Sequence, residues 1–323
     1  MIVTVTANPS LDRLIALGAP LRRGAVHRAE ATVADPGGKG VNVSRAVHVA
    51  GEPTVAVLPA DAGDPLLLAL GRLGVPARAV PSGCEIRSNI TIAEPDGTTT
   101  KLNSPGAELG PAVARALEDA IVAAADGAAW VALCGSLPPG LPDDWYARIV
   151  ERLAGGPRIA VDTSGPALAA VADAGVDLLK PNAEELAELV GVGDQDFEHR
   201  VAAGDLEAAR VAAEELHRRS GAAVLATLGA AGALLVDGGT WFATPPPTTV
   251  RSTVGAGDSA LAGYLLGHTA GEPAPARLRL AVAYGSAAAA LPGTRAPRPD
   301  QLATADVRLR PLETASPEEP ETS

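Results

Sequence analysis

The chain has 323 residues, a length that suits one large α/β domain or two ordinary ones. Hydrophobic residues make up 47% of it and charged residues 20%, so the chain can bury a substantial core and is not a disordered protein. Its net charge of −12 argues against a surface for nucleic acids or anionic membranes. An anionic substrate must therefore be held by a local cluster of donors.

The sequence lacks the features of secreted, zinc-binding and membrane-spanning proteins. Two cysteines, Cys84 and Cys134, cannot form a disulfide framework or a cysteine zinc site. The five histidines contain no HxxxH pair. The N-terminus does not read as a signal peptide, and no apolar run reaches the roughly 18 residues of a spanning helix. We therefore expect a soluble cytoplasmic protein with no membrane and no nucleic-acid partner.

The first third of the chain predicts a strand, a helix and a hairpin. Residues 2–6 form a β-branched run that ends at Asn8-Pro9, which predicts a first strand. A glycine-rich segment over residues 35–40 precedes a helical pattern. Residues 88–94 and 98–102 alternate around Pro-Asp-Gly and predict a β-hairpin. An isolated hairpin is marginal in water, so this one needs a partner surface, such as a lid that pairs with a second copy.

From residue 130 onward, strand and helix patterns alternate. The predicted strands cover residues 130–134, 158–162, 177–180 and 223–227. The predicted helices cover residues 144–153, 167–174, 183–190, 206–220, 259–269 and 276–291. This alternation predicts a parallel sheet with helices on both faces. The Pro/Glu/Ser/Thr composition from about residue 313 predicts a disordered tail.

The segment Val254-Gly255-Ala256-Gly257-Asp258 leads directly into a helical pattern. Its two glycines let backbone N–H groups converge at a helix N-terminus, where the partial positive charge favours an anion. Asp258 beside such an anion hole can accept a proton from an attacking hydroxyl. The alternative is that Asp258 merely caps the helix, because Asp is a favoured cap residue.

A second glycine motif, Gly37-Gly38-Lys39-Gly40-Val41-Asn42, is neither a Walker A loop nor a GxGxxG fingerprint. Its glycines let the backbone approach a ligand, with Lys39 as a mobile donor and Asn42 able to reach hydroxyls. An ordinary loop before a helix explains it equally well. Asp12, just past the first strand, is either a surface cap or a bidentate acceptor for sugar hydroxyls.

Three further segments follow predicted strands. Asn182 and Glu185 fall on one face of a first helical turn, which suits hydrated Mg²⁺ near phosphates. A helix N-terminal turn with acidic residues placed for the helix dipole explains them equally well. Residues 227–232 form a glycine-bearing loop that is compatible with a nucleotide site or a plain turn. Residues 135–140 form a stiff loop that exposes Ser136.

Taken together and in this order, these segments resemble the PfkB/ribokinase-like carbohydrate kinases. The nearest branch is that of the 1-phosphofructokinases and tagatose-6-phosphate kinases. The resemblance runs from Thr4 to about residue 295. It rests on residues 4–12, 35–42, 85–87, 97–100, 135–142, 162–165, 180–185 and 254–259.

The resemblance implies a ribokinase-like, three-layer α/β/α fold with a mainly parallel sheet and a small β lid. The kinase domain would cover residues 1–310, with lid elements around 12–35 and 86–104, followed by a disordered acidic tail over 311–323. Family members transfer the γ-phosphoryl group of ATP to a sugar hydroxyl with Mg²⁺. The resemblance also implies a homodimer through the lid, and it leaves a monovalent cation as an open cofactor.

Roles for individual residues follow from the same resemblance. Asp258 would be the catalytic base, with the anion hole formed by the backbone of Gly255, Ala256 and Gly257. The sugar would contact Asp12, Gly38, Lys39 and Asn42, and its phosphate would lie near Arg28, Arg87 and Ser136. ATP would be bound by Lys180, Thr227, Gly229, Gly232 and Gly257, and Mg²⁺ by Asn182 and Glu185. Part of a helix over residues 283–289 would flank the adenine.

The leading hypothesis is phosphorylation of fructose 1-phosphate at its 6-hydroxyl to give fructose 1,6-bisphosphate. Alternatives are tagatose 6-phosphate or fructose 6-phosphate as substrate, then an unphosphorylated sugar or nucleoside, and finally a non-catalytic sugar-phosphate sensor. Arg28 and Arg87 favour a phosphosugar because guanidinium groups bind phosphate through paired hydrogen bonds. Residues 57–65, Lys101 and Ser104 depart from the branch's usual pattern, so the exact sugar stays open.

Overall fold

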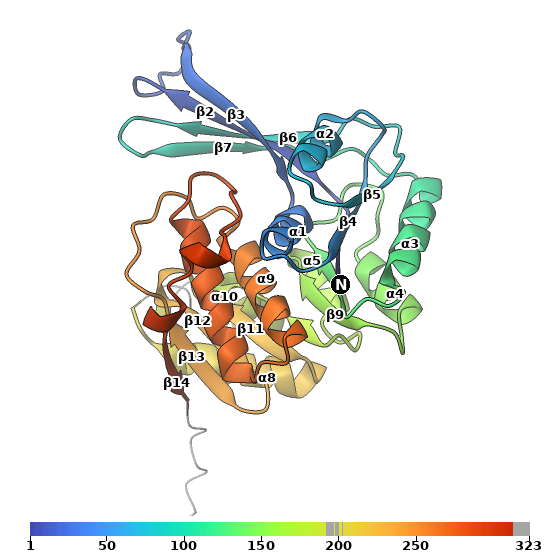
Figure 1. The fold of residues 1–323 in the computed structure, drawn as a ribbon, viewed down its shortest axis with the longest axis vertical. Coiled ribbons are helices and arrows are strands. Elements are labelled where there is room, and N and C mark those ends of the chain that lie inside the picture. The colour runs from blue at the N-terminus through green and yellow to red at the C-terminus, as the bar shows by residue number, and fades with distance from the viewer. Residues whose placement is uncertain (192–196, 198–199, 202, 313–323) are drawn as a thin grey trace, which may run out of the picture.

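A computed structural model describes residues 1–191, 197, 200–201 and 203–312. Within them, ten strands form a main sheet and four strands form a second sheet (Figure 1). In spatial order the main sheet contains β14 (Arg308–Pro311), β13 (Thr240–Thr244), β12 (Ala233–Val236), β11 (Ala223–Thr227), β10 (Leu178–Leu179), β9 (Arg158–Asp162), β8 (Trp130–Cys134), β1 (Ile2–Thr6), β4 (Thr54–Pro59) and β5 (Ala77–Val80). Every pairing from β5 to β11 is parallel.

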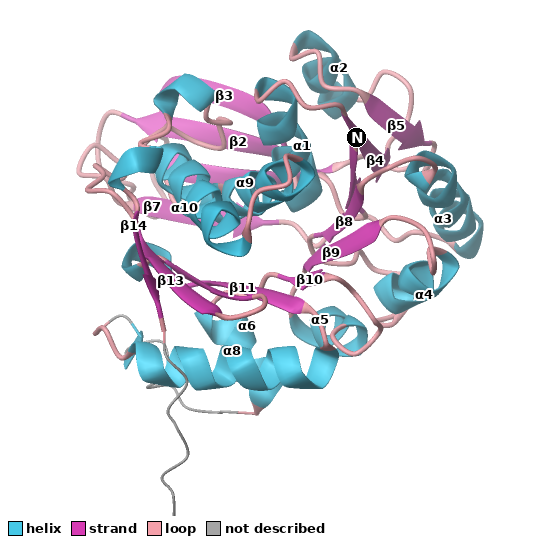
Figure 2. Ribbon diagram, turned by 60° about the horizontal axis from the view of Figure 1, so that its bottom comes forward, coloured by secondary structure: helices cyan, strands magenta, loops and turns pink. Residues whose placement is uncertain are grey.

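Helices cover both faces of the main sheet (Figure 2). One face carries α1 (Lys39–Val49), α2 (Pro65–Arg72), α9 (Ala256–Thr269) and α10 (Ala274–Ala289). The other carries α3 (Pro111–Ala125), α4 (Trp145–Arg152), α5 (Gly165–Val171), α6 (Ala183–Val190) and α8 (Leu206–Ser220). Because both faces are covered, central strands such as β1 and β8 are buried at every residue, as parallel strands require. The predicted three-layer α/β/α fold is confirmed.

Most predicted elements are found with the expected bounds, and the differences have local causes. β10 is one residue shorter than predicted at each end, although the amides of Asp177 and Lys180 still donate to β9. α9 begins at Ala256, three residues before the predicted start, because Gly255 in the left-handed region (φ 80°) forms its N-cap. The antiparallel strands β12 and β13 are not among the predicted strands, although Asp237-Gly238-Gly239 between two short apolar runs is a turn signal.

The second sheet, which we call the lid sheet, has the order β3 (Ala29–Gly37), β2 (Ser10–Leu17), β6 (Arg87–Ala93) and β7 (Thr99–Asn103). It extends away from the main body in Figure 1. The predicted hairpin is β6–β7, and it pairs through β6 with β2 in parallel register. This chain therefore supplies one partner surface itself. Since β2 begins soon after β1 ends, the lid sheet starts at the carboxyl edge of the main sheet.

The C-terminal boundary expected at residue 310 falls inside a strand. β14 runs to Pro311 and pairs antiparallel with β13, and the Leu312 amide donates to the Thr240 carbonyl at 2.8 Å. The remainder of the predicted tail, residues 313–323, lies outside the described residues. In the described part of the chain, every helix is too short or too polar to cross a membrane.

Candidate active site

Polar residues gather where the parallel strands of the main sheet end. Asn8 follows β1, Ser136 follows β8, Asp162 ends β9, Lys180 follows β10 and Thr227 ends β11. Carboxyl ends of parallel strands share one edge of a sheet, and ligands of open α/β folds bind there. The N-terminal turn of α1 adds Lys39 to the same edge, because Lys39 contacts Asp162.

An ion cluster occupies the centre of this edge. Asp162 is fully buried, and its two carboxylate oxygens lie 2.7 Å from Lys39 Nζ and 3.0 Å from Lys180 Nζ. Burial alone would raise the pKa of Asp162, but the two lysines hold it below its usual value. Lys39 Nζ also lies 3.9 Å from Glu185 Oε1. The structure thus places Lys39, predicted to contact sugar, between the carboxylates of Asp162 and Glu185.

Asp258 is buried in the first turn of α9, where Asn42 Nδ2 donates to its Oδ2 at 2.8 Å. Burial and the charge of Asp162 raise the pKa of Asp258 to about 6, and the Asn42 hydrogen bond opposes that rise. A Cβ on the neighbouring Gly257 would lie 3.5 Å from Lys180 Nζ, so an ammonium group stands beside this helix N-terminus. The arrangement combines a proton acceptor with donors for an anion.

Asp12 lies at the base of the lid sheet. Its Oδ1 accepts hydrogen bonds from Ser10 Oγ at 2.8 Å and from Asn89 Nδ2 at 3.0 Å. A Cβ on Gly37 would lie 2.3 Å from the Asp12 carboxylate, so the glycine leaves the space that this side chain occupies. Within the described residues, the buried Asn89 Oδ1 has no hydrogen-bond partner. Asp12 and Asn89 thus form a pair of acceptors suited to sugar hydroxyls.

Arg87 and Ser136, the predicted phosphate-binding residues, come together around Asn8. Arg87 Nη2 donates to the Asn8 carbonyl at 3.1 Å and its Nη1 to the Ser104 carbonyl at 2.9 Å, and Asn8 Nδ2 donates to Ser136 Oγ at 3.4 Å. Burial lowers the pKa of Arg87, against the charge of Asp12. Among the described residues, its buried Nε has no partner. A further acceptor, such as a phosphate oxygen, would satisfy that donor.

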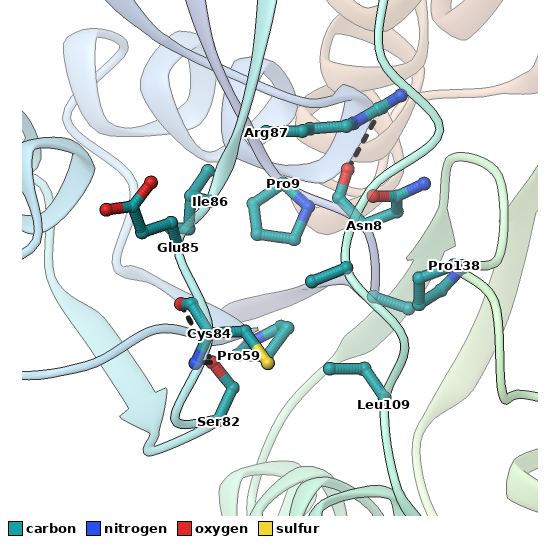
Figure 3. Close-up of a pocket in the computed structure, with 12 residues that line it drawn as sticks. Asn8, Pro9, Pro59, Ser82, Cys84, Glu85, Ile86, Arg87, Leu109 and Pro138 are labelled. Carbon is teal, nitrogen blue, oxygen red and sulfur yellow. Dashed lines mark hydrogen bonds between the residues drawn. The ribbon is translucent and has the colours of Figure 1, made fainter.

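Behind Arg87 lies a cavity of about 20 Å³ (Figure 3). It is lined by Ala7, Asn8, Pro9, Pro59, Ser82, Cys84, Glu85, Ile86, Arg87, Ala107, Leu109 and Pro138. A space of this size holds about one water molecule. The atypical loop over residues 57–65 supports this wall, because Asp61 Oδ1 accepts from the amides of Ser82 and Gly83 at 2.9 and 3.1 Å.

Arg28 does not join the site of its own chain. It is exposed and immediately precedes β3. Asp12 pairs with Asp35 in the β2–β3 ladder, so Arg28 lies at the far end of that strand, roughly 20 Å away at about 3.3 Å per residue. Gly38 lies at the near end, where its φ of 109° and the contact of a Cβ with Thr6 at 2.6 Å require glycine.

Asn182 and Glu185 form a capping box at the start of α6. Glu185 N donates to Asn182 Oδ1, and Asn182 N donates to Glu185 Oε2, both at 2.8 Å. Burial raises the pKa of Glu185. Its Oε1 takes no part in the capping box and lies 3.9 Å from Lys39 Nζ. A single carboxylate beside substrate phosphates suits Mg²⁺, so the donor set fits this ion. In the described part of the chain, three or more acidic, His or Cys side chains nowhere gather around a common metal position.

The remaining residues predicted to bind the nucleotide adjoin this turn. Thr227 forms an isolated bridge with Asn182, and its amide donates to the Pro181 carbonyl at 3.0 Å. Gly229 starts a 3₁₀ turn, whereas Gly232 has a packing explanation: a Cβ there would lie 2.0 Å from the Ala243 carbonyl of β13.

A cavity of about 510 Å³ is lined by residues of α10 and of the segments before α9 and after α10: Pro246, Pro247, Thr248, Thr249, Arg251, Ala283, Ser286, Ala287, Ala290, Gln301, Ala303 and Asp306.

The model of the pfkB family of carbohydrate kinases matches residues 6–301. The chain belongs to this family. It is 37% identical to a 1-phosphofructokinase of Rhodobacter capsulatus over 316 residues, which cover 94% of each chain. It is 34% identical to an ATP-dependent 6-phosphofructokinase isozyme 2 of Escherichia coli over 300 residues, 91% of this chain and 94% of the relative. The crystal structure of phosphofructokinase-2 from Escherichia coli in complex with potassium has a TM-score of 0.83 at 32% identity, covering 93% of this chain and 96% of that one.

Family membership makes the chain a phosphotransferase that uses an alcohol group as acceptor, with ATP and Mg²⁺ as the cofactors of its family. The site also contains residues for which the sequence predicted no role. The sequence does mark Asp162, because it is a carboxylate at the end of a strand and lies in residues 162–165, one of the segments that carry the resemblance. No sequence pattern marks Asn89 as a site residue, because it reaches Asp12 only through the parallel pairing of β6 with β2.

Proposed function

We propose that this pfkB-family kinase transfers the γ-phosphoryl group of ATP to the 6-hydroxyl of fructose 1-phosphate. The observation that carries the proposal is the unpaired, buried Nε of Arg87, beside a sugar-binding carboxylate and within the same strand-end edge as Asp258. An unsatisfied guanidinium donor favours an anionic group on the substrate. The similarity to a 1-phosphofructokinase over 94% of the chain supports the choice of sugar.

The proposed chemistry is proton removal and charge stabilisation. With a pKa of about 6, Asp258 is mostly ionised at neutral pH and can accept the proton of the attacking hydroxyl. Asp12 holds the sugar hydroxyls, and Arg87 with Ser136 holds the phosphate that the substrate already carries. The amides of Gly255, Ala256 and Gly257, with Lys180, stabilise the transferred phosphoryl group.

For the nucleotide, we propose that Glu185 Oε1 faces the metal and that Asn182 holds Glu185 in place through the capping box. Mg²⁺ would neutralise charge on the ATP phosphates. Thr227 and Gly229 line the phosphate path, and the cavity beside α10 receives the adenine. A dependence on a monovalent cation is also proposed, because the related phosphofructokinase-2 of Escherichia coli forms a complex with potassium.

We further propose a homodimer through the lid sheet. Val33 and Leu102 on its strands are 43% and 55% exposed, and Val26 in the β2–β3 connection is 92% exposed. The strand register places Val33 and Leu102 on opposite faces of the lid sheet, so both faces expose apolar side chains, which favours a partner surface. Such a dimer also gives Arg28 a role, since it lies too far from Asp12 of its own chain and could serve the site of a second copy.

The test is coupled ADP release with Mg-ATP and purified protein against fructose 1-phosphate, fructose 6-phosphate, tagatose 6-phosphate, fructose and adenosine. We expect saturable turnover with fructose 1-phosphate and a kcat/KM for it that exceeds the others at least about tenfold. Fructose 6-phosphate is the second candidate, because one relative is named a 6-phosphofructokinase. Like fructose 1-phosphate, it carries a phosphate and a free hydroxyl on opposite arms of its furanose ring. Turnover of fructose but of no sugar phosphate would contradict the proposal that Arg87 binds a phosphate of the substrate.

A further inference from the structure

Arg45 lies on α1, one turn after Asn42, and is only 5% exposed. Its Nη1 approaches three oxygen atoms: the Pro36 carbonyl at 3.0 Å, Asn42 Oδ1 at 3.3 Å and Thr294 Oγ1 at 3.1 Å. Burial lowers the pKa of Arg45, and the carboxylates of Asp35 and Asp12 oppose that effect. A buried guanidinium is unfavourable unless its donors are matched, so this side chain holds its acceptors in defined positions.

The contact with Asn42 determines which way its amide faces. A guanidinium group can only donate hydrogen bonds, so Asn42 must present its oxygen to Arg45. The amide nitrogen is then directed to Asp258, to which it donates at 2.8 Å. If the amide rotated, its oxygen would face the carboxylate of Asp258, and two acceptors would repel each other. Arg45 thus fixes the hydrogen bond that orients Asp258 without touching it.

The other two contacts of Arg45 reach the neighbouring walls of the site. Pro36 precedes Gly37, the residue that lies against the Asp12 carboxylate. Thr294 lies behind Gly255, since a Cβ on that glycine would be 3.8 Å from Thr294 Cα and 3.8 Å from Asn42 Nδ2. One side chain therefore connects the sugar-binding end of β3, the amide that holds Asp258 and the start of the anion hole.

We propose that Arg45 is a positioning residue for phosphoryl transfer, acting through Asn42 on the Asp258 carboxylate. The proposal rests on the proposed function, because it takes Asp258 as the proton acceptor. Arg210 offers a matched control: its side chain is equally buried, at 7% exposed, but it pairs with Glu207 and Glu214 on α8, on the other face of the sheet.

The kinetic test compares Arg45→Met, Asn42→Ala, the double variant and Arg210→Met. We expect Arg45→Met to lower kcat about 10- to 100-fold, which is less than the loss expected when the general base itself is removed. The KM values for the sugar phosphate and for ATP should stay within about threefold of wild type. Because Arg45 acts through Asn42, the double variant should lose no more than about threefold beyond Asn42→Ala alone. Arg210→Met should lose stability but keep its kcat. Independent, multiplicative losses in the double variant would overturn the proposal, as would an unchanged kcat in Arg45→Met.

A second measurement does not need activity. The carboxyl of Asp258 is faced by Asp162 and Cys134 at strand ends, Lys39 on α1 and Lys180 after β10, and all of these stay in place in the Arg45 variants. Carbon-13 NMR should show the pKa of Asp258 above its wild-type value in Arg45→Met, since the carboxylate loses the oriented Asn42 donor. An unchanged pKa would overturn the positioning role even if the wild type proved inactive on every sugar tested. Should Arg45→Met fail to fold, Arg45→Lys keeps the charge, lacks the planar fork and carries the same expectations.

Discussion

The ion cluster and the lid sheet are built in opposite ways. Around Asp162 and Asp258, charged groups are buried at the ends of the main sheet, and each faces a partner contributed by a distant part of the chain. In the lid sheet, Asp12 is half-buried, while Asn89 Oδ1 and Arg87 Nε have no partner among the described residues. In the first region each carboxylate is already held by a charged or hydrogen-bonding partner of this chain. The second leaves donors and acceptors for one.

This contrast separates the chemistry from the choice of substrate. Rigid, desolvated groups suit phosphoryl transfer, because preorganised charges need no rearrangement in the transition state. A half-exposed sheet with unsatisfied polar atoms suits recognition, and it can close over the sugar and exclude water. Substitutions in the first region should therefore lower kcat, and those in the second should raise KM for the sugar phosphate.

The largest effect is expected for Asp258→Asn. Without a proton acceptor, kcat should fall by a factor on the order of 10² to 10⁴, while ATP affinity stays near its wild-type value. Coupled ADP release and nucleotide titration measure the two quantities. Asp237→Asn is the control, since Asp237 bonds Tyr264 and Arg277 near the other end of the strands. Near-normal kcat in Asp258→Asn would remove it from the role of base.

The same Asp258→Asn variant should be more stable than the wild type at pH 7. The folded-state pKa of about 6 lies above the ordinary aspartate value, so the fold favours the protonated form. Ionised Asp258 therefore lowers the free energy of unfolding. This loss is complete above pH 6 and vanishes below the unfolded-state pKa of about 4. Thermal unfolding should show a Tm gain of a few degrees at pH 7 that disappears near pH 4; the same gain at both values would contradict the assignment.

Arg87→Ala should act on substrate binding. Loss of charge-assisted hydrogen bonds to the substrate phosphate should raise KM for the sugar phosphate roughly 10- to 100-fold, with KM for ATP nearly unchanged. Arg13→Ala is the matched control, because Arg13 lies exposed on the adjacent strand of the same sheet and contacts Ser88. Equal increases in both KM values would argue against a phosphate-binding role for Arg87.

The pH dependence of the wild type should report Asp258. Below its pKa of about 6 the carboxyl is protonated and cannot accept a proton, so kcat/KM should fall about tenfold per pH unit. Initial rates between pH 5 and 8, at fixed free Mg²⁺, measure this limb. The residual activity of Asp258→Asn should lack this fall of kcat/KM at low pH. If the fall persists in that variant, a group other than Asp258 causes it.

The smallest effect is expected at the lid surface. Leu102→Glu places a charge on the proposed interface and should convert a dimer to a monomer, with a few-fold rise in KM for the sugar phosphate and little change in kcat. Sedimentation velocity and initial rates measure both. Val211→Glu is the control, since Val211 is 51% exposed on α8. A wild-type protein that sediments as a monomer would reject the proposed dimer.

The sequence by itself determined the features that depend on neighbouring residues. A β-branched run predicted β1, strand-like runs predicted β8 and β9, and the glycines before Asp258 marked a helix N-terminus, because these signals lie within one strand or one turn. The sequence also predicted that Arg87 and Ser136 lie near one ligand, through the resemblance to a family. It did not predict that they meet around Asn8.

Only the tertiary structure decided which polar groups face one another. Asn42 and Asp258 are 216 residues apart in the sequence, and Lys39 and Asp162 are 123 apart, so no local pattern pairs them. Arg28 shows the converse, because it is close to Asp12 in the sequence yet an extended strand carries it to the far end of the lid sheet. Strand pairing and sheet order, which sum many weak contacts over the whole chain, set these distances.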